Sequence, residues 1–211
     1  MATIQQNQLG IVERLYRSEY SAREIAEQLG VSIDAVYYSL RRIEVPRRTP
    51  VEQSRVLLKR KAHSYSIKKK LTAVERELFI AGIMLYWGEG SQWDGEASVD
   101  FANSKPEMIK VFLKFLRVVC GVDEQRLRCY LYCYCNQDVN ALIRYWSKIT
   151  KIPKKQFTKP YIRADYDERK KSKMPYGLIH IRYSDKRLLF QLKQWIHDAP
   201  ERLTGLHISM I

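Results

Sequence analysis

The chain lacks the features that mark membrane, secreted and zinc-binding proteins. No apolar run approaches the roughly 18 residues that a membrane-spanning helix needs, and the N-terminal MATIQQNQ has no basic segment or apolar core of a secretory signal. The four cysteines contain no CxxC pair, which argues against a zinc site; they are Cys120, Cys129, Cys133 and Cys135. We therefore expect a cytoplasmic protein with reduced thiols and no membrane partner.

Positive charge is what the sequence has in excess. It holds 37 Lys and Arg against 23 Asp and Glu, a net charge of +14, while its 45% hydrophobic residues are enough for a packed core. Residues 51–71 alone carry seven basic residues and one acidic residue, and a second basic run lies between Lys151 and Lys173. Basic proteins gain affinity for duplex DNA by releasing its counterions. The alternative is a basic protein that binds nothing anionic.

The first fifty residues have the pattern of three short helices. Apolar residues recur at helical spacing over residues 4–17, which predicts the first helix. Ser21 and Glu24 form a capping box for a second helix, and Gly30 ends it because glycine tolerates left-handed backbone. Ser32 then caps a third helix. Two short helices joined by a glycine turn predict a DNA-binding helix-turn-helix.

The segment SAREIAEQLGVSIDAVYYSLRR resembles the helix-turn-helix of bacterial regulators and site-specific recombinases. The resemblance implies that the third helix enters the major groove of double-stranded DNA. The residues expected to contact DNA there are Ser32, Ile33, Asp34, Tyr37, Tyr38, Arg41 and Arg42. Arg47 and Arg48 form either a minor-groove arm or a plain solvated linker. The competing interpretation of the whole segment is a trihelical interaction module.

Three regions are expected along the chain. Residues 1–48 form the helix-turn-helix domain, residues 49–71 form a partly helical basic linker, and residues 72–211 form a second domain. The charge of the linker either contacts phosphates, which would position the protein without reading sequence, or is a solvated face.

An apolar helix over residues 78–91, LFIAGIMLYWGEGS, ends in a single acid, Glu89. Its LYWGEG resembles the motif helix of the LAGLIDADG homing-endonuclease superfamily, although that family more often has Asp at the acidic position. The resemblance covers about residues 74–197, with a very short first strand at 92–96. The later elements agree in order: strand 98–103, helix 106–120, strand 126–135, helix 139–149, strand 176–184 and helix 188–196. The implied fold is α+β, an antiparallel saddle sheet with helices packed on one face.

Two expected strands alternate between apolar and polar positions. Leu127, Cys129, Leu131, Cys133 and Cys135 would face a core, as would Ile179, Ile181 and Tyr183. The family uses the opposite face of such a sheet as a saddle in the major groove. The DNA contacts that this resemblance implies are Arg126, Arg128, Tyr130, Tyr132, Tyr134, His180 and Arg182. The alternative is an ordinary half-buried antiparallel sheet. The segment from Lys151 to Lys173 is expected to be an extended, mobile basic loop.

Catalysis is implied only by the resemblance. The superfamily pairs two motif helices so that their terminal acids hold divalent ions, usually Mg²⁺, which assist phosphodiester hydrolysis. One motif per chain implies a homodimer through the helix over residues 81–88. The residues near the contact would be Ala81, Met84, Leu85 and Gly88, and Glu89 would be the catalytic carboxylate that binds the metal. The alternative is that this helix is buried within one subunit.

Asn103, Lys105 and Lys186 occupy the positions where the family keeps water-organising side chains; the alternative for each is a phosphate contact or a surface charge. The family's catalytic lysine has no clear counterpart. The first hypothesis is a homodimeric, Mg²⁺-dependent, site-specific DNA endonuclease (a hydrolase). The second is a nucleoid-associated regulator that binds DNA without cleaving it and needs no cofactor. RNA binding and a recombination accessory role are further alternatives.

Overall fold

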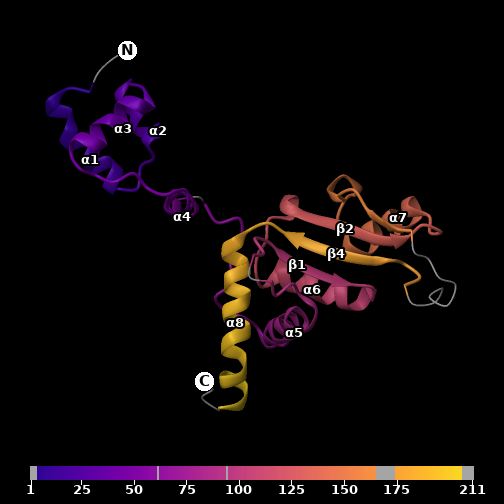
Figure 1. Ribbon diagram of the computed structural model, residues 1–211. Helices are drawn as coiled ribbons and strands as arrows, with labels where there is room; N and C mark the ends of the chain where they lie inside the picture. Colours follow the sequence, from indigo (N-terminus) through magenta and orange to yellow (C-terminus); the bar gives the residue numbers. More distant parts are fainter. Residues whose placement is uncertain (1–3, 61, 94, 165–173, 206–211) are drawn as a thin grey trace. The chain divides into compact units, whose positions relative to one another are not determined.

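The computed structural model describes residues 4–60, 62–93, 95–164 and 174–205. The chain divides into two compact units, Met1–Ala62 and His63–Ile211. Over the described residues the fold is α+β, with eight α-helices and a four-stranded mixed sheet (Figure 1).

The first unit is helical. Its elements are the 3-10 helix η1 (Gln6–Gln8) and the helices α1 (Leu9–Arg17), α2 (Ala22–Leu29), α3 (Ile33–Arg42) and α4 (Pro50–Arg60). One apolar cluster joins α1, α2 and α3, with Val12, Ile25 and Val36 fully buried at its centre. The expected apolar spacing is therefore confirmed, because each helix turns its periodic face toward the other two.

The helix ends form as their residue types predict. The Ser21 hydroxyl accepts a hydrogen bond from the Glu24 backbone N–H at 3.2 Å, and the Glu24 carboxylate accepts one from the Ser21 N–H at 2.7 Å. Gly30 has a φ of 66°, the left-handed conformation that ends α2. Ser32 then caps α3 by accepting from the Ala35 N–H at 3.1 Å.

The expected linker is divided between the two units. Its first part is α4, whose Lys59 pairs with Glu19 at 3.0 Å and whose Arg60 pairs with Glu24 at 2.8 Å, both within the first unit. Residues from His63 onward belong to the second unit. There, the Ser66 N–H donates to the Cys120 carbonyl at 3.1 Å. These local bonds correct the expectation of one continuous linker over residues 49–71.

From residue 98 onward the second unit follows the expected element order with one added strand, whereas residues 92, 93, 95 and 96 form no strand, so the expected first strand at 92–96 is wrong over the described residues. Its elements are α5 (Ala73–Glu89), β1 (Val99–Asn103), α6 (Pro106–Val118), η2 (Glu124–Arg126), β2 (Leu127–Tyr134), α7 (Val139–Thr150), η3 (Lys154–Gln156), β3 (Tyr161–Arg163), β4 (Leu178–Tyr183) and α8 (Lys186–Thr204). The sheet order is β1-β4-β2-β3. β4 pairs antiparallel with β1 and β2, whereas β3 pairs parallel with β2.

The short strand β3 corrects two expectations. A purely antiparallel sheet is wrong, because β3 makes the sheet mixed. The described part of the segment expected to be a mobile loop, residues 151–164, is instead bound along β2. The Thr158 N–H donates to the Cys129 carbonyl at 2.9 Å, and the Cys135 N–H donates to the Arg163 carbonyl at 3.0 Å.

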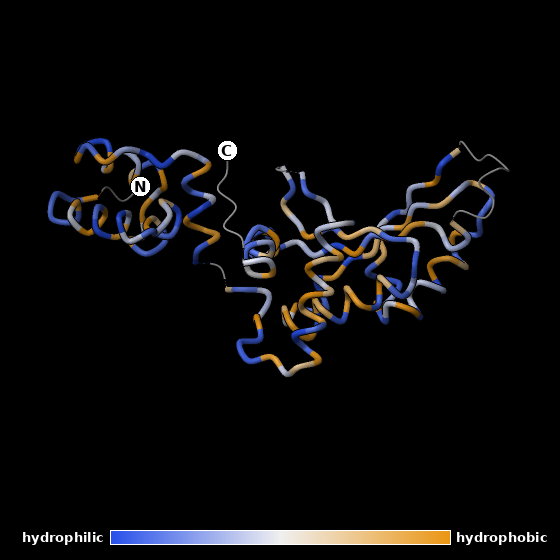
Figure 2. The backbone as a smooth tube through the Cα atoms, turned by 90° about the horizontal axis from the view of Figure 1, so that it is seen from below, coloured by the Kyte–Doolittle hydropathy of each residue, from blue (hydrophilic) through white to orange (hydrophobic). Residues whose placement is uncertain are grey.

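One apolar core fills the space between the helices and one face of the sheet. Leu127, Cys129, Ile179 and Ile181 are fully buried on that face, as their alternation predicts. In Figure 2 the hydrophobic segments of this unit gather where its helices and strands meet. The opposite face, called here the outer face, carries Asp100, Ala102, Arg128, Tyr130, Tyr132, His180 and Arg182. Among the described helices, none is both long and apolar enough to cross a lipid bilayer.

Candidate functional site

The expected DNA-contacting residues of α3 share one surface. Ile33 and Tyr38 are 39% and 60% exposed. Asp34, Arg41 and Arg42 are exposed too, and Ser32 and Tyr37 are half-buried. Arg42 donates a hydrogen bond to the Gln6 side chain at 2.7 Å. The same helix therefore packs one side into the core and presents tyrosine, arginine and short polar side chains on the other.

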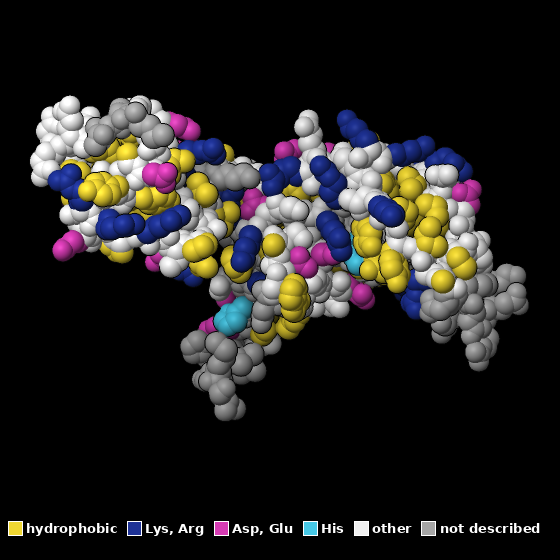
Figure 3. Space-filling view, turned by 45° about the horizontal axis from the view of Figure 1, so that its top comes forward, with side chains coloured by type: hydrophobic (Ala, Val, Ile, Leu, Met, Phe, Trp, Pro, Cys, Tyr) yellow, Lys and Arg dark blue, Asp and Glu magenta, His cyan; other side chains and the backbone are white. Residues whose placement is uncertain are grey.

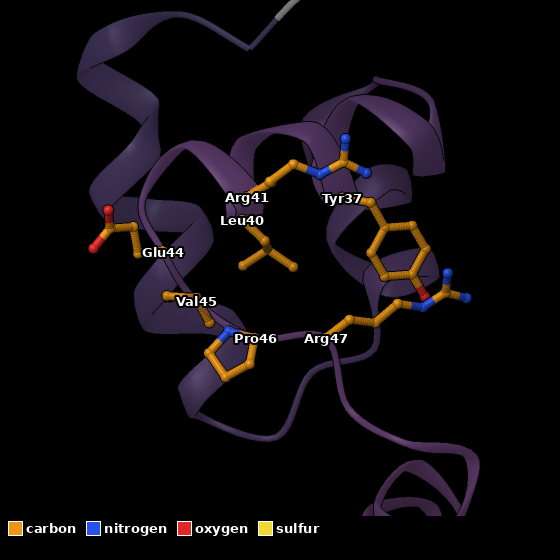
Figure 4. A pocket seen from close by; sticks show the side chains of 7 residues that line it. All are labelled: Tyr37, Leu40, Arg41, Glu44, Val45, Pro46 and Arg47. Carbon is orange, nitrogen blue, oxygen red and sulfur yellow. The ribbon is translucent and has the colours of Figure 1, made fainter.

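A hollow of about 350 Å³ adjoins the end of α3 (Figure 4). It is lined by Tyr37, Leu40, Arg41, Glu44, Val45, Pro46 and Arg47. The Arg47 guanidinium lies 4.1 Å from the centre of the Tyr37 ring, a cation–π contact that holds it beside the helix. Two guanidinium groups, those of Arg41 and Arg47, thus border one concave surface.

Arg48 differs from the expected minor-groove arm. Its guanidinium donates to the backbone carbonyls of Tyr16 and Tyr20 and lies 4.0 Å from the centre of the Tyr16 ring. Its own N–H donates to the Tyr16 hydroxyl at 2.9 Å. Arg48 therefore fixes the chain after α3 against α1.

The outer face of the sheet brings together most of the residues expected there. Arg128, Tyr130, Tyr132, His180 and Arg182 all lie on it, and Figure 3 shows Lys, Arg and hydrophobic side chains, tyrosine included, on the second unit. Hydrogen-bonded register sets Arg128 opposite Arg182 and Tyr130 opposite His180.

Three residues of the expected alternation are misplaced. Arg126 lies in η2 rather than on the strand, and its guanidinium donates to the Ser184 carbonyl. Tyr134 is only 6% exposed, and Cys135 is exposed instead of buried. Arg126 precedes β2, which begins at Leu127. Tyr134 and Cys135 depart from the alternation because β2 ends at Tyr134, whose N–H donates to the Gln137 side chain.

The other three cysteines are buried free thiols, as expected. Burial raises the pKa of Cys129 to about 12, so this thiol stays protonated.

Asp100 is a central residue of the outer face that the sequence did not reveal. Its carboxylate lies 2.8 Å from His180 Nδ1 and accepts a hydrogen bond from Arg182 Nε at 2.7 Å. Burial alone would raise the pKa of Asp100, but the hydrogen bonds and charges of His180 and Arg182 outweigh it and hold the pKa below its ordinary value. Asp100 is therefore an anion that fixes two side chains of this face.

Tyr161 of β3 is a second residue that was missed. It pairs with Tyr132 across the β2–β3 ladder, and their ring centres are 4.8 Å apart. The aromatic and β-branched residues of YIR were the only signal for this strand, and three residues are too few for a period-two pattern.

The four residues implied for catalysis do not all lie together, because Lys186 is at the opposite end of β4 from Asn103 and Lys105. Asn103 pairs with Ile179 at the start of β4, whereas Lys186 follows the other end of β4, about 13 Å away along the strand. The Asn103 side chain is buried and accepts from the Lys105 N–H at 2.8 Å, which makes it a turn former. Lys105 and Lys186 are exposed at the starts of α6 and α8.

Glu89 is exposed at the end of α5. Over the described residues, no group of three or more His, Cys, Asp or Glu side chains could hold a metal ion. One chain thus supplies a single carboxylate where the resemblance implies Mg²⁺, and its own residues do not fit a complete metal site. Beside Glu89, Ala81, Met84 and Leu85 of α5 border an apolar groove shared with α6, about 450 Å³ in volume.

Comparisons of the chain with models of protein families, with curated proteins and with solved structures gave no match.

Proposed function

We propose that the protein binds double-stranded DNA, with α2, the Gly30 turn and α3 acting as a helix-turn-helix. The observation that carries the proposal is the exposed face of α3, on which Tyr38, Arg41 and Arg42 point away from the core. In such a motif the second helix enters the major groove, while arginines at its end bind phosphate. The net charge of +14 suits this polyanionic partner.

The second unit supports a DNA-binding role through its layered form. Its helices pack on one face of the sheet, as the LAGLIDADG resemblance implies. A protein of this kind would work in the cytoplasm at the nucleoid. Because Lys186 lies at the opposite end of β4 from Asn103 and Lys105, we favour binding without cleavage, as in a transcriptional regulator.

A duplex-selection experiment followed by fluorescence anisotropy tests this function. Arg41→Ala should weaken duplex binding and lower the slope of log K against log salt by about 0.9, the value for one lost phosphate contact. Arg17→Ala is the matched control, because Arg17 is an exposed arginine on α1, paired with Glu13. Equal slopes of log K against log salt for wild type and Arg41→Ala would contradict the assignment of α3 as the helix that contacts DNA.

Cleavage by a homodimer is the second candidate, and the position of Glu89 favours it. Glu89 is exposed next to the apolar groove of Ala81, Met84 and Leu85, and a Cβ added at Gly88 would meet no atom within 4 Å. A second copy packed here would bring two Glu89 carboxylates near each other.

Digestion of a plasmid library with Mg²⁺ tests this candidate. Discrete cuts that disappear in Glu89→Gln, with duplex binding retained, would establish cleavage. Light scattering supplies the second criterion. A protein mass of only 25.0 kDa, the mass of one chain, with or without DNA would exclude an active site shared by two chains.

A further inference from the structure

The outer face of the sheet holds four aromatic rings in mutual contact. The Tyr132 ring is stacked with His180 at 5.0 Å and 29°, lies 4.8 Å from Tyr161 and meets Tyr130 edge-on at 5.1 Å. These centre-to-centre distances are those of favourable aromatic pairs. The ring cluster of Tyr130, Tyr132, Tyr161 and His180 is therefore assembled in the protein alone.

The exposed part of the ring cluster lies at its edge. Tyr132 is half-buried among the other rings, whereas Tyr161 on β3 is 50% exposed. Tyr161 thus presents a flat ring to the solvent, held from behind by Tyr132. Such a ring loses little conformational freedom when another ring stacks on it.

Basic residues flank the ring cluster. The Arg182 guanidinium lies 4.8 Å from the centre of the Tyr130 ring and is fixed there by Asp100, and exposed Arg128 is its neighbour across the ladder. The segment leading into β3, which contacts β2 at Leu127 and Cys129, carries exposed Lys154, Lys155 and Lys159. An aromatic centre with cationic flanks is complementary to a chain of bases and phosphates.

The aromatic centre suits unpaired bases rather than a duplex. In a duplex the base faces are stacked on each other, and only base edges and phosphates are accessible in the grooves. Bases without a partner strand can stack on tyrosine and histidine, which is how exposed sheets commonly hold single strands. A tyrosine ring face would have little to contact on a closed double helix.

We propose that the outer face of the second unit is a binding site for single-stranded nucleic acid, with unpaired bases stacked on the ring cluster and phosphates held by Arg128 and Arg182. This site is separate from α3 and does not depend on duplex binding there. Because every base can stack on an aromatic ring, the site should distinguish single strands from duplexes but should not distinguish one base sequence from another.

The test measures anisotropy of the full chain with three labelled probes of about 16 nucleotides, an upper site size for a single-strand binding fold: oligodeoxyuridylate, oligouridylate and a blunt DNA duplex. Tyr161→Leu should lose about 5- to 150-fold in affinity for the preferred single strand, the range that one lost stacking contact gives. Tyr161→Phe, which keeps an aromatic ring at this position, should have the wild-type affinity for the single strand. Neither substitution should change duplex affinity.

Tyr38→Leu is the matched control, since Tyr38 is 60% exposed and lies on α3. It should weaken duplex binding and leave single-strand binding unchanged. Quenching of 2-aminopurine placed in the single strand gives an independent readout of stacking. The single-stranded probe that binds more tightly, DNA or RNA, identifies the natural ligand of the site. The proposal is overturned if neither single strand binds, or if Tyr161→Leu binds it as tightly as wild type. Duplex binding by α3 would survive either result.

Discussion

The exposed face of α3 and the outer face of the sheet differ in what their side chains touch. Within the described residues, the side chains of Tyr38 and Arg41 make no hydrogen bond or ion pair, so the helix backbone alone sets their positions. On the sheet, Asp100 binds His180 and Arg182, and the tyrosine rings pack against each other. The helix surface can adapt to a ligand, whereas the sheet surface is preorganised. Substitutions should accordingly affect binding alone on α3, but both folding and binding on the sheet.

The largest effect is expected beneath the sheet. Phe112 is fully buried, with its ring centre 4.2 Å from that of Phe101. Phe112→Ala should destabilise the second unit by about 3–5 kcal/mol, the cost of deleting a buried aromatic ring. Native-state hydrogen exchange, which resolves the two units separately, measures it. Phe190→Ala is the control, because Phe190 is 54% exposed. Equal loss of protection in the first unit would show that the two units do not fold separately.

The next effect tests the preorganisation of the outer face. Asp100→Asn removes the charge that binds His180 and Arg182, and should destabilise the second unit by about 2 kcal/mol, as for a hydrogen-bonded charge. The pKa of Asp100 is lowered in the folded state, so its contribution is present above its ordinary value of 3.8 and is lost as the pH falls below that. Urea unfolding at several pH values should show wild type and variant converging below about pH 4.

The control for Asp100 is Asp198→Asn, since Asp198 also contacts a histidine, His197, but its side chain is 51% exposed. Its effect should stay within about 0.5 kcal/mol. If Asp100→Asn were equally mild, the outer face would not be held by this carboxylate, and the contrast with α3 would fail.

A smaller effect is expected at the start of α2. Ser21→Ala removes a helix cap and should destabilise the first unit by about 1 kcal/mol, without changing the second. Hydrogen exchange of the two units again measures the difference. Ser18→Ala, an exposed serine at the end of α1, should change neither. A shift in the second unit would contradict the separation of the two cores.

The two surfaces also differ in how far sequence could predict them. The Ser21 and Gly30 positions depend on residues a few places apart, so local patterns were enough to locate α2 and α3. The Asp100 network depends on residues 80 and 82 places away, brought together by the register of β1 and β4. The same register separates Asn103 from Lys186, which the resemblance had placed in one site. Alternation predicted which side of a strand was buried, but not which residues lay beside each other.

The smallest effect on stability, and the sharpest test of the contrast, belongs to Arg41→Ala. Arg41 is exposed and, over the described residues, its side chain has no hydrogen-bond or ion-pair partner, so the free energy of unfolding of the first unit should change by less than about 0.5 kcal/mol. The affinity of the variant for duplex DNA should nevertheless fall, because the Arg41 side chain can contact a phosphate without contributing to the stability of the fold. Urea unfolding and anisotropy on the same preparation measure both quantities. If the variant lost both stability and duplex binding, Arg41 would be a residue that stabilises the first unit, and the proposed role in DNA binding alone would be wrong.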